Sequence, residues 1–167
     1  KGYREMKRLG WISLLPKMVG VQATGCSPIF STWKQDGEMV AVRPSTIADS
    51  VAVGAPRNWR RALAAIQESG GTMAAVSDRE ILQAMNVLGE RSGIVAGPGS
   101  AAALAGLVSL LRSREIPRSA SALLVLIESG LRHAHAAIEA TGAVRTVAAN
   151  FEQVRQIVER SLSRTPF

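Results

Sequence analysis

The sequence GIVAGPGSAAALAGLVSLL, residues 93–111, decides how the rest of the chain is organised. It opens with a short apolar run, turns through Gly97-Pro98-Gly99 and continues as a stretch of small and apolar residues. This order predicts a buried strand, a tight turn and a helix. Such a turn leaves backbone N–H groups at the positive end of the helix dipole, which suits an anion or an anionic cofactor. The simpler interpretation is a small-residue helix that packs tightly against a sheet.

Outward from this stretch, apolar runs and helical patterns alternate. Short apolar runs predict strands at residues 18–23, 72–76, 93–96 and 122–127, with a further extended segment at 144–148. Helical periodicity predicts helices at residues 2–9, 28–35, 46–53, 59–69, 78–93, 98–111, 131–140 and 151–164. The alternation predicts an α/β fold with an open, mainly parallel sheet flanked by helices. Ligands of such sheets bind beyond the carboxyl ends of the strands, so the candidate positions are the turns at residues 24–27, 97–100 and 128–130.

The helix predicted to follow residue 77 has a clear start signal. Ser77 and Glu80 have the spacing of a capping box, in which each side chain satisfies a backbone N–H group of the other residue. The apolar face that follows includes Ile81 and Leu88. We therefore expect a well-defined helix directly after the second predicted strand.

Length and composition fit one globular domain. The chain has 167 residues, of which 47% are apolar and 20% charged, and this length can bury a core without disulfides or metal. Cys26 is the one cysteine, so no intramolecular disulfide can form and a reducing cytoplasm is the expected location. We expect its thiol to be buried and inert. No apolar run approaches the ~20 residues of a membrane span, and we expect no secretory signal.

The net charge of +7 raises the question of nucleic-acid binding. The arginines are spread over many segments and form no recognisable nucleic-acid motif, so we expect neither a nucleic acid nor a membrane as partner. His133 and His135 stand two residues apart on a predicted helix and point in different directions, which is poor geometry for a shared metal. We expect no metal site and assign both histidines to the surface or a loop.

Five blocks of sequence carry a resemblance to a known family. They are GYREMKRLGWISLLPKMVGVQATGCSPI (residues 2–29), TIADS (46–50), GAPRNWRRALAAIQESGG (54–71), AVSDREIL (75–82) and GPGSAAALAGL (97–107). In this order they resemble the second half of threonine synthases, which belong to the tryptophan-synthase-like (fold type II) family of pyridoxal-phosphate (PLP) enzymes. The resemblance extends over nearly the whole chain.

The resemblance implies a place for this chain in a larger enzyme. Family members are carbon–oxygen lyases of amino-acid biosynthesis that convert O-phosphohomoserine and water to threonine and phosphate, with PLP as electron sink. Their Schiff-base lysine, the asparagine beside the cofactor and the phosphate cradle lie in the half that would precede Lys1. Residues 1–167 would then be a single domain, the carboxyl-terminal part of the large domain, with no catalytic residue and no activity alone. The sequence leaves open whether the chain is part of a working enzyme.

Two motifs near the cofactor depart from the family pattern. Gly97 stands where the family has the glutamate of Glu-Pro-Ala-Ser, so the carboxylate near the cofactor ring is lost. Ile127 aligns with the threonine of Thr-Gly-X-Gly-Leu-Lys, whose hydroxyl bonds the pyridine nitrogen, and isoleucine cannot replace it. Ser129 could supply a hydroxyl if the turn shifts by two residues. Glu128 is the other polar candidate, and a carboxylate there would favour a protonated ring, a stronger electron sink and a change of reaction.

The resemblance also places Gln22 and Ala23, at the end of the first predicted strand, beside the cofactor pocket. A tight turn without ligand contact is an equally good interpretation of this position. The candidate cofactor-binding residues are therefore Gln22, Ala23, Gly97, Ile127, Glu128 and Ser129.

Two alternatives to a threonine synthase stay open. The altered strand end could belong to another fold type II lyase or an ammonia-lyase, or the losses at Gly97 and Ile127 could mark a non-catalytic binding or assembly module. In each enzyme case the substrate is an amino-acid-type small molecule. A sheet without its first half would expose an unpaired edge. We therefore expect the chain to pair with the missing half, with a complementary chain or with itself.

Overall fold

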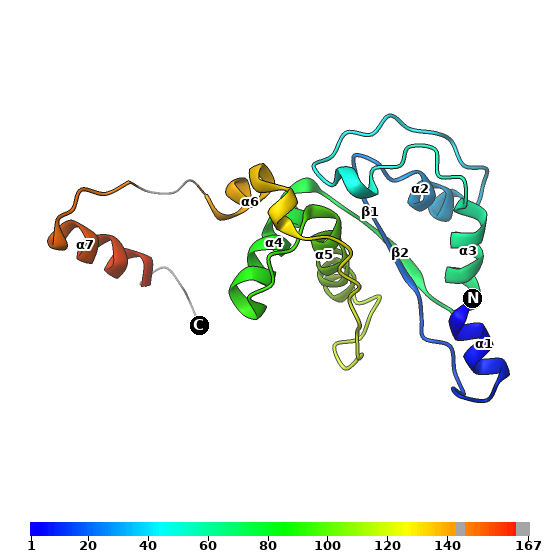
Figure 1. Ribbon diagram of the computed structural model, residues 1–167. Helices are drawn as coiled ribbons and strands as arrows, with labels where there is room; N and C mark the ends of the chain where they lie inside the picture. The colour runs from blue at the N-terminus through cyan, green and yellow to red at the C-terminus, as the bar shows by residue number, and fades with distance from the viewer. Residues whose placement is uncertain (143–145, 163–167) are drawn as a thin grey trace.

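Two parallel strands form the sheet in the part of the chain that the structure describes (Figure 1). In the computed structural model, which describes residues 1–142 and 146–162, β1 (Val19–Ala23) pairs with β2 (Thr72–Val76). Val19 lies opposite Thr72 and Ala23 lies opposite Val76. Both strands are short apolar runs at positions predicted from the sequence. The long connection between them contains helices, as a parallel pair requires.

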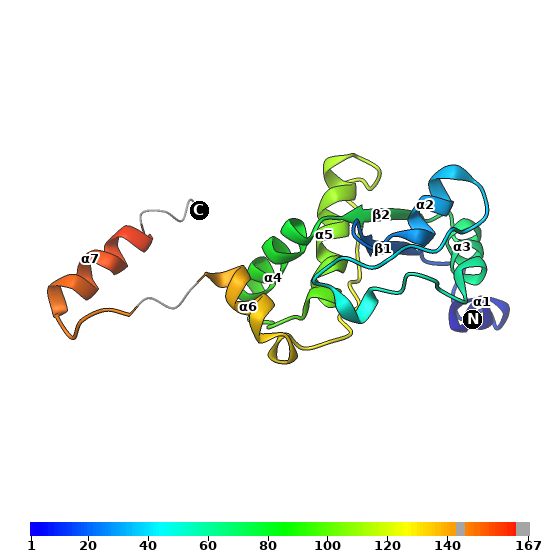
Figure 2. The same cartoon turned by 90° about the horizontal axis from the view of Figure 1, so that it is seen from above.

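Helices lie on both faces of this sheet. The helical elements of the described residues are α1 (Gly2–Arg8), α2 (Pro28–Gln35), the short 3-10 turn η1 (Asp49–Val51), α3 (Trp59–Glu68), α4 (Asp78–Ser92), α5 (Pro98–Arg112), a second 3-10 turn η2 (Gly130–Arg132), α6 (Ala134–Thr141) and α7 (Phe151–Leu162), and not all of them contact the sheet. α5 packs against one face of the strands, and α2 and α3 lie on the other (Figures 1 and 2). α4 packs against α5, and α6 packs against α4. This arrangement confirms an α/β fold with a parallel sheet flanked by helices.

The main core lies between the sheet, α4 and α5. Its buried residues are Ala23, Ala48, Val76, Ile81, Ala84, Met85, Leu88, Ala96, Ala101, Ala102 and Ala105. The members from α5 are all alanines, and Gly106 of α5 lies so close to β1 that a Cβ at this position would be 2.4 Å from Val21 Cγ2. The expected small-residue helix, packed tightly against a sheet, is therefore confirmed.

The predicted helix starts are confirmed at α4 and α5. The N–H group of Glu80 donates to Ser77 Oγ over 3.3 Å, and the N–H group of Ser77 donates to Glu80 Oε2 over 2.7 Å, so the capping box is complete. The second of these bonds, from the backbone of Ser77, lowers the pKa of Glu80. Pro98 is the first residue of α5, where a missing N–H group breaks no helical hydrogen bond.

Two of the predicted strands are wrong. Residues 93–96 are irregular, and Ala96 makes only an isolated antiparallel bridge with Ser129. Residues 122–127 pair with no strand in the described part of the chain, and Leu123, Val125 and Ile127 are 82%, 68% and 62% exposed. A strand is completed by a hydrogen-bonded neighbour, and the structure gives these two segments no such neighbour among residues 1–142 and 146–162.

Smaller differences occur at the other predicted elements. Of the helix predicted at residues 46–53 only the turn η1 forms, and the helix predicted at 131–140 is divided into η2 and α6. The extended segment predicted at 144–148 falls partly outside the described residues, as do the last two positions of the helix predicted to end at 164. Cys26 is buried, as predicted, and burial raises the pKa of its thiol. None of the helices in the described ranges is both long enough and apolar enough to cross a membrane.

Candidate functional site

A cavity of about 350 Å³ lies beside the start of α5. It is lined by Asp49 and Ser50 of η1 and by Glu128, Arg132 and His133. η1 contacts α5. The segment at residues 128–130 is one of the three turns at which the sequence predicts a ligand.

Asp78 bonds the segment before η1 to the carboxyl end of the sheet. Asp78 is the first residue of α4 and follows β2 closely. Its carboxylate accepts a hydrogen bond from Thr46 Oγ1 and another, of 3.1 Å, from the N–H group of Ile47. These bonds fix the chain just before η1, and η1 contributes Asp49 and Ser50 to the cavity.

Ser100 fixes the backbone of Glu128. The fully buried Ser100 hydroxyl donates to the Glu128 carbonyl over 3.0 Å and accepts from the Glu128 N–H group over 2.8 Å. The N–H group of Gly97 also donates to the Glu128 carbonyl, over 3.3 Å. Glu128, directly after the 122–127 segment, is therefore anchored to the start of α5 through both its N–H and its carbonyl group.

The Glu128 side chain is held at both of its oxygens. Oε1 accepts from the N–H group of Gly99 over 2.5 Å, and Oε2 lies 3.1 Å from His133 Nε2. The side chain is 11% exposed. A carboxylate at this end of a helix is also stabilised by the helix dipole.

Gly97 and Gly99 make the room for this carboxylate. A Cβ at position 97 would lie 2.7 Å from Glu128 Cγ and 2.8 Å from Oε1, and a Cβ at position 99 would lie 2.8 Å from the same Oε1. The backbone at Gly97 has φ of −76°, which any residue can adopt. The glycine at 97 is therefore explained by the space that Glu128 occupies and not by backbone conformation.

Glu128 occupies the anion position that the sequence predicts at the start of α5. The sequence predicts free N–H groups there, suited to an anion from outside the protein. In the structure the Gly99 N–H group is bonded to the chain's own carboxylate. The start of α5 is therefore a filled anion position and not an open phosphate cradle.

His133 is a member of this site that the sequence prediction missed. It lies in a loop between η2 and α6, as expected, but its side chain is only 17% exposed and lies between Glu128 and Asp49, whose Oδ1 is 3.7 Å from Nδ1. The prediction failed because residues 130–132 form a 3-10 turn and not the first turn of a helix. His135 is exposed, in agreement with the prediction.

The other predicted site residues lie outside the lining of this cavity. Ile127 is exposed, and Ser129 Oγ accepts from the N–H group of Leu131 and caps η2. Gln22 Oε1 accepts from the N–H group of Phe30 in α2 over 2.9 Å, and Ala23 is buried in the core. Among the six candidates, the structure brings Glu128 to the cavity and places Gly97 directly behind it.

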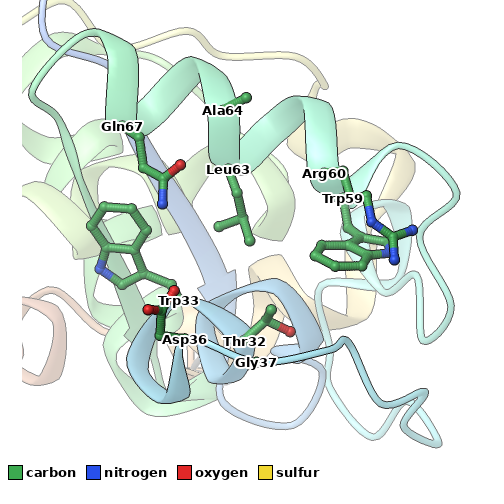
Figure 3. A pocket seen from close by; sticks show the side chains of 9 residues that line it. All are labelled: Thr32, Trp33, Asp36, Gly37, Trp59, Arg60, Leu63, Ala64 and Gln67. Atoms are coloured by element: carbon green, nitrogen blue, oxygen red, sulfur yellow. The ribbon is translucent and has the colours of Figure 1, made fainter.

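A second cavity, of about 250 Å³, lies between α2 and α3 on the opposite face of the sheet (Figure 3). Figure 3 shows Trp33 and Trp59 at its two ends with Leu63 between them. The Arg60 guanidinium stacks on the Trp59 ring at 4.2 Å and also pairs with Glu38. This cavity therefore combines aromatic walls with a guanidinium that already has partners.

The Glu128 cavity matches one side of PLP and not the whole cofactor. Glu128 offers a fixed carboxylate to a ring nitrogen, and Ser50 and Arg132 offer a hydroxyl and a guanidinium. The Schiff base needs a lysine, and none of the chain's lysines, at positions 1, 7, 17 and 34, lines the cavity that the described residues form. The donor set therefore offers a partner to the ring nitrogen and none to the aldehyde.

Comparisons with known proteins agree with this fold. The family described as pyridoxal-phosphate dependent enzyme matches residues 1–128. Threonine synthase from Methanosarcina acetivorans is 36% identical over 160 residues, which are 95% of this chain and 40% of that protein. Threonine synthase from Methanocaldococcus jannaschii is 38% identical over 143 residues, 84% of this chain and 35% of that protein. The crystal structure of threonine synthase from Escherichia coli shares the fold, with a TM-score of 0.59 and 16% identity over 88% of this chain and 38% of that one.

The chain spans about 40% or less of the length of these curated relatives. The family match includes the α5 start and Glu128 and ends before His133. With most of its length covered by that match, and with sequence similarity to threonine synthases over nearly all of it, the chain belongs to the pyridoxal-phosphate dependent enzyme family.

Proposed function

We propose that this chain is the carboxyl-terminal portion of a PLP-dependent, threonine-synthase-like lyase and forms one wall of its cofactor site. The observation that carries this proposal is the similarity to threonine synthases over nearly the whole chain, and the fixed Glu128 carboxylate marks the wall that the chain would form. The proposed reaction is that of the threonine synthases, O-phosphohomoserine and water giving threonine and phosphate. The chain alone would be inactive, since the lysine would come from a segment that corresponds to the part of the relatives beyond this chain.

In this proposal Glu128 is the residue of this chain that holds the cofactor. PLP, when bound, acts as an electron sink for bonds next to the substrate's amino-bearing carbon. The carboxylate would face the pyridine nitrogen and favour its protonated form. Ser100 and Gly99 keep Glu128 in place through its backbone and Oε1.

The proposed partner is the complementary part of the enzyme, and the contact surface is the edge formed by residues 122–127. The exposed Leu123, Val125 and Ile127 alternate with the half-buried Leu124 and Leu126, which is the pattern of a strand with one covered face. An exposed apolar edge of this kind attracts another strand. In the absence of the complementary segment, the same edge would drive self-association. We place the protein in a reducing cytoplasm, which is consistent with its single, buried thiol.

One observation favours a second candidate, another fold type II lyase such as an ammonia-lyase. A carboxylate beside the ring makes the cofactor a stronger electron sink than a hydroxyl does, and this can change which bond of the substrate breaks. Glu128 is the group that would produce this change. A non-catalytic module remains the candidate if PLP does not bind.

The test uses the longest reading frame that contains this chain, with the 167-residue chain as control. Both proteins are incubated with PLP and O-phosphohomoserine, and released inorganic phosphate and threonine are measured. The proposal predicts both products in equal amounts from the long protein and none from the chain alone. Ammonia release from threonine or serine, without phosphate release from O-phosphohomoserine, would replace it with the second candidate. Failure of all these reactions in the long protein would contradict the enzyme proposal.

A further inference from the structure

The two oxygens of the Glu128 carboxylate are bonded to different elements. Oε1 is bonded to the first turn of α5, through Gly99, and Oε2 is bonded to the loop that follows η2, through His133. A carboxylate with one bonded oxygen can rotate about its last side-chain torsion, whereas bonds at both oxygens fix the plane of the group. Hydrogen bonds to a charged acceptor are also stronger than those between neutral groups.

The turn η2 is built so that the His133 imidazole returns to Glu128. Ser129 caps the turn from its side chain, and the N–H group of His133 donates to the Gly130 carbonyl over 2.9 Å. A Cβ at position 130 would lie 2.7 Å from the Ala96 carbonyl oxygen, so the turn passes too close to Ala96 for a larger residue. The position of His133 is therefore set by several local contacts and not by chance orientation of a surface side chain.

The imidazole also has a defined orientation. Nε2 lies 3.1 Å from Glu128 Oε2, within hydrogen-bond distance, and Nδ1 lies 3.7 Å from Asp49 Oδ1. Because a carboxylate only accepts hydrogen bonds, the shorter contact assigns a proton to Nε2. Asp49 is exposed and Arg132 lines the same cavity, so the pair is surrounded by both signs of charge.

From these contacts we infer that His133 is a positioning residue, which fixes the plane of the Glu128 carboxylate as that group faces the cofactor ring. This inference rests on the proposed function. His133 does not itself contact the ring, and it acts only through Glu128. For this role, the side chain at position 133 must present an N–H donor at the position of Nε2.

The first arm of the test needs no cofactor. Ring-nitrogen NMR of the 167-residue chain, isotope-labelled at histidine, reports the proton on each nitrogen. We expect a slowly exchanging Nε2–H signal for His133 and a rapidly exchanging one for His135, the exposed control in the same chain. Glu128→Ala should abolish the slow His133 signal. A fast-exchanging His133 in the parent chain, or a slow signal that survives Glu128→Ala, would overturn the pairing.

The second arm measures PLP binding by absorbance in the longest reading frame that contains this chain. His133→Ala should weaken binding about tenfold, as the loss of one hydrogen bond to a charged group would, and should shift the cofactor band in the same direction as Glu128→Gln. His133→Gln, whose side-chain amide keeps a donor near the Nε2 position, should restore most of the affinity and the band position. His135→Ala is the matched control and should leave both unchanged.

The outcomes separate this inference from the proposed function. If Glu128→Gln shifts the band and His133→Ala does not, His133 is not a positioning residue, although the cofactor site stands. Equal loss in His133→Ala and His133→Gln would assign it a packing role and overturn the inference. If the parent long protein binds no PLP, the proposed function fails and the ring-facing role of Glu128 fails with it, while the NMR arm still decides whether the pair exists.

Discussion

At the scale of single residues, Glu128 occupies the space that side chains at positions 97 and 99 would need. Compared with the family pattern that the chain resembles, a glutamate is lost at Gly97, while Glu128 is present about thirty residues away. Only the folded chain brings the two positions together, through the bonds between the first turn of α5 and Glu128. The carboxylate at the start of α5 is therefore supplied by a different segment of the chain, and this arrangement can be tested by substitution.

Gly97→Ala should destabilise the protein only when Glu128 is present. The new Cβ would lie within 2.8 Å of three side-chain atoms of Glu128, and overpacking of this kind costs about 1–3 kcal/mol. In a Glu128→Ala background the clash is gone, and since φ at position 97 suits alanine the same substitution should be neutral or stabilise by about 0.4–1 kcal/mol. Free energies of unfolding in urea, measured for all four proteins, give the coupling between the two sites.

The matched control is Gly89→Ala in α4, where a Cβ meets no atom within 4 Å. It should stabilise the helix by about 1 kcal/mol in both backgrounds. An equal cost of Gly97→Ala with and without Glu128 would contradict the proposed use of this space.

The capping box at the start of α4 gives a pH-dependent contribution to stability. The pKa of Glu80 is lowered in the folded chain by the hydrogen bond from the Ser77 backbone. A carboxylate with a depressed pKa stabilises the folded state above its unfolded pKa, and this contribution is lost as the pH falls through the folded value. The stability difference between the parent and Glu80→Gln should therefore be largest near neutral pH and shrink in the acid range.

Urea unfolding at several pH values measures this difference. Glu90→Gln, in the same helix and exposed, controls for the loss of one negative charge. A difference between parent and Glu80→Gln that stays constant from neutral to acid pH would show that the capping carboxylate is not bonded as described.

The capping box could be predicted because its signal is local, with Ser77 and Glu80 three positions apart. His133 could not, since its partner Glu128 is reached through a 3-10 turn that has no helical or strand period. The candidate list from the resemblance contained Glu128, but sequence alone could not select it over Ile127 and Ser129. That selection depends on which side chain points inward, and this is set by the contact of residue 128 with Ser100.

At the scale of elements, α5 determines how closely the helix layer approaches the sheet. Apart from Pro98 and Leu110, its buried residues are alanine, glycine and serine, and Gly106 lies directly against Val21 of β1. The small side chains bring the helix axis close to the strands. The length and type of this helix were predictable, because its proline start and its small apolar residues are both local signals.

Gly106→Ala should destabilise the chain by about 1–3 kcal/mol, since its Cβ would lie 2.4 Å from Val21 Cγ2 in a position that cannot relax without moving the helix. Val21→Ala removes the atoms it would strike, so the double substitution should cost less than the sum of the two single ones. Thermal or urea unfolding of the three variants provides the measurement. Strict additivity would mean that α5 and β1 are not in the contact described.

The two wrong strands have a common cause. Residues 93–96 and 122–127 have the composition of strands, and composition reports only that a segment can lie in a sheet. Whether it does depends on a neighbour, and the described residues contain only β1 and β2 as paired strands. Residues 93–96 end at the start of α5, and residues 122–127 end at Glu128. At both places, hydrogen bonds to side chains and to other backbone groups replace those between paired strands.

At the scale of the whole molecule, the apolar edge at residues 122–127 should control association. We expect the 167-residue chain to self-associate at micromolar concentration, because three large apolar side chains there are mostly exposed. Val125→Lys should shift sedimentation towards the monomer, since a charge in this exposed apolar segment opposes its pairing with another chain. Val40→Lys, at an exposed valine in a loop, is the control and should leave association unchanged. A parent chain that is a clean monomer with cooperative unfolding would contradict this expectation.

If this chain is one wall of a PLP site whose lysine lies in a complementary segment, the cofactor spectrum should reveal it. PLP is titrated by absorbance, across the near-ultraviolet and visible range, into the 167-residue chain and into the longest reading frame that contains it. We expect the absorption band of lysine-bound cofactor in the long protein only, with weaker binding in its Glu128→Gln variant. A band in the isolated chain, or no band in either protein, would contradict it.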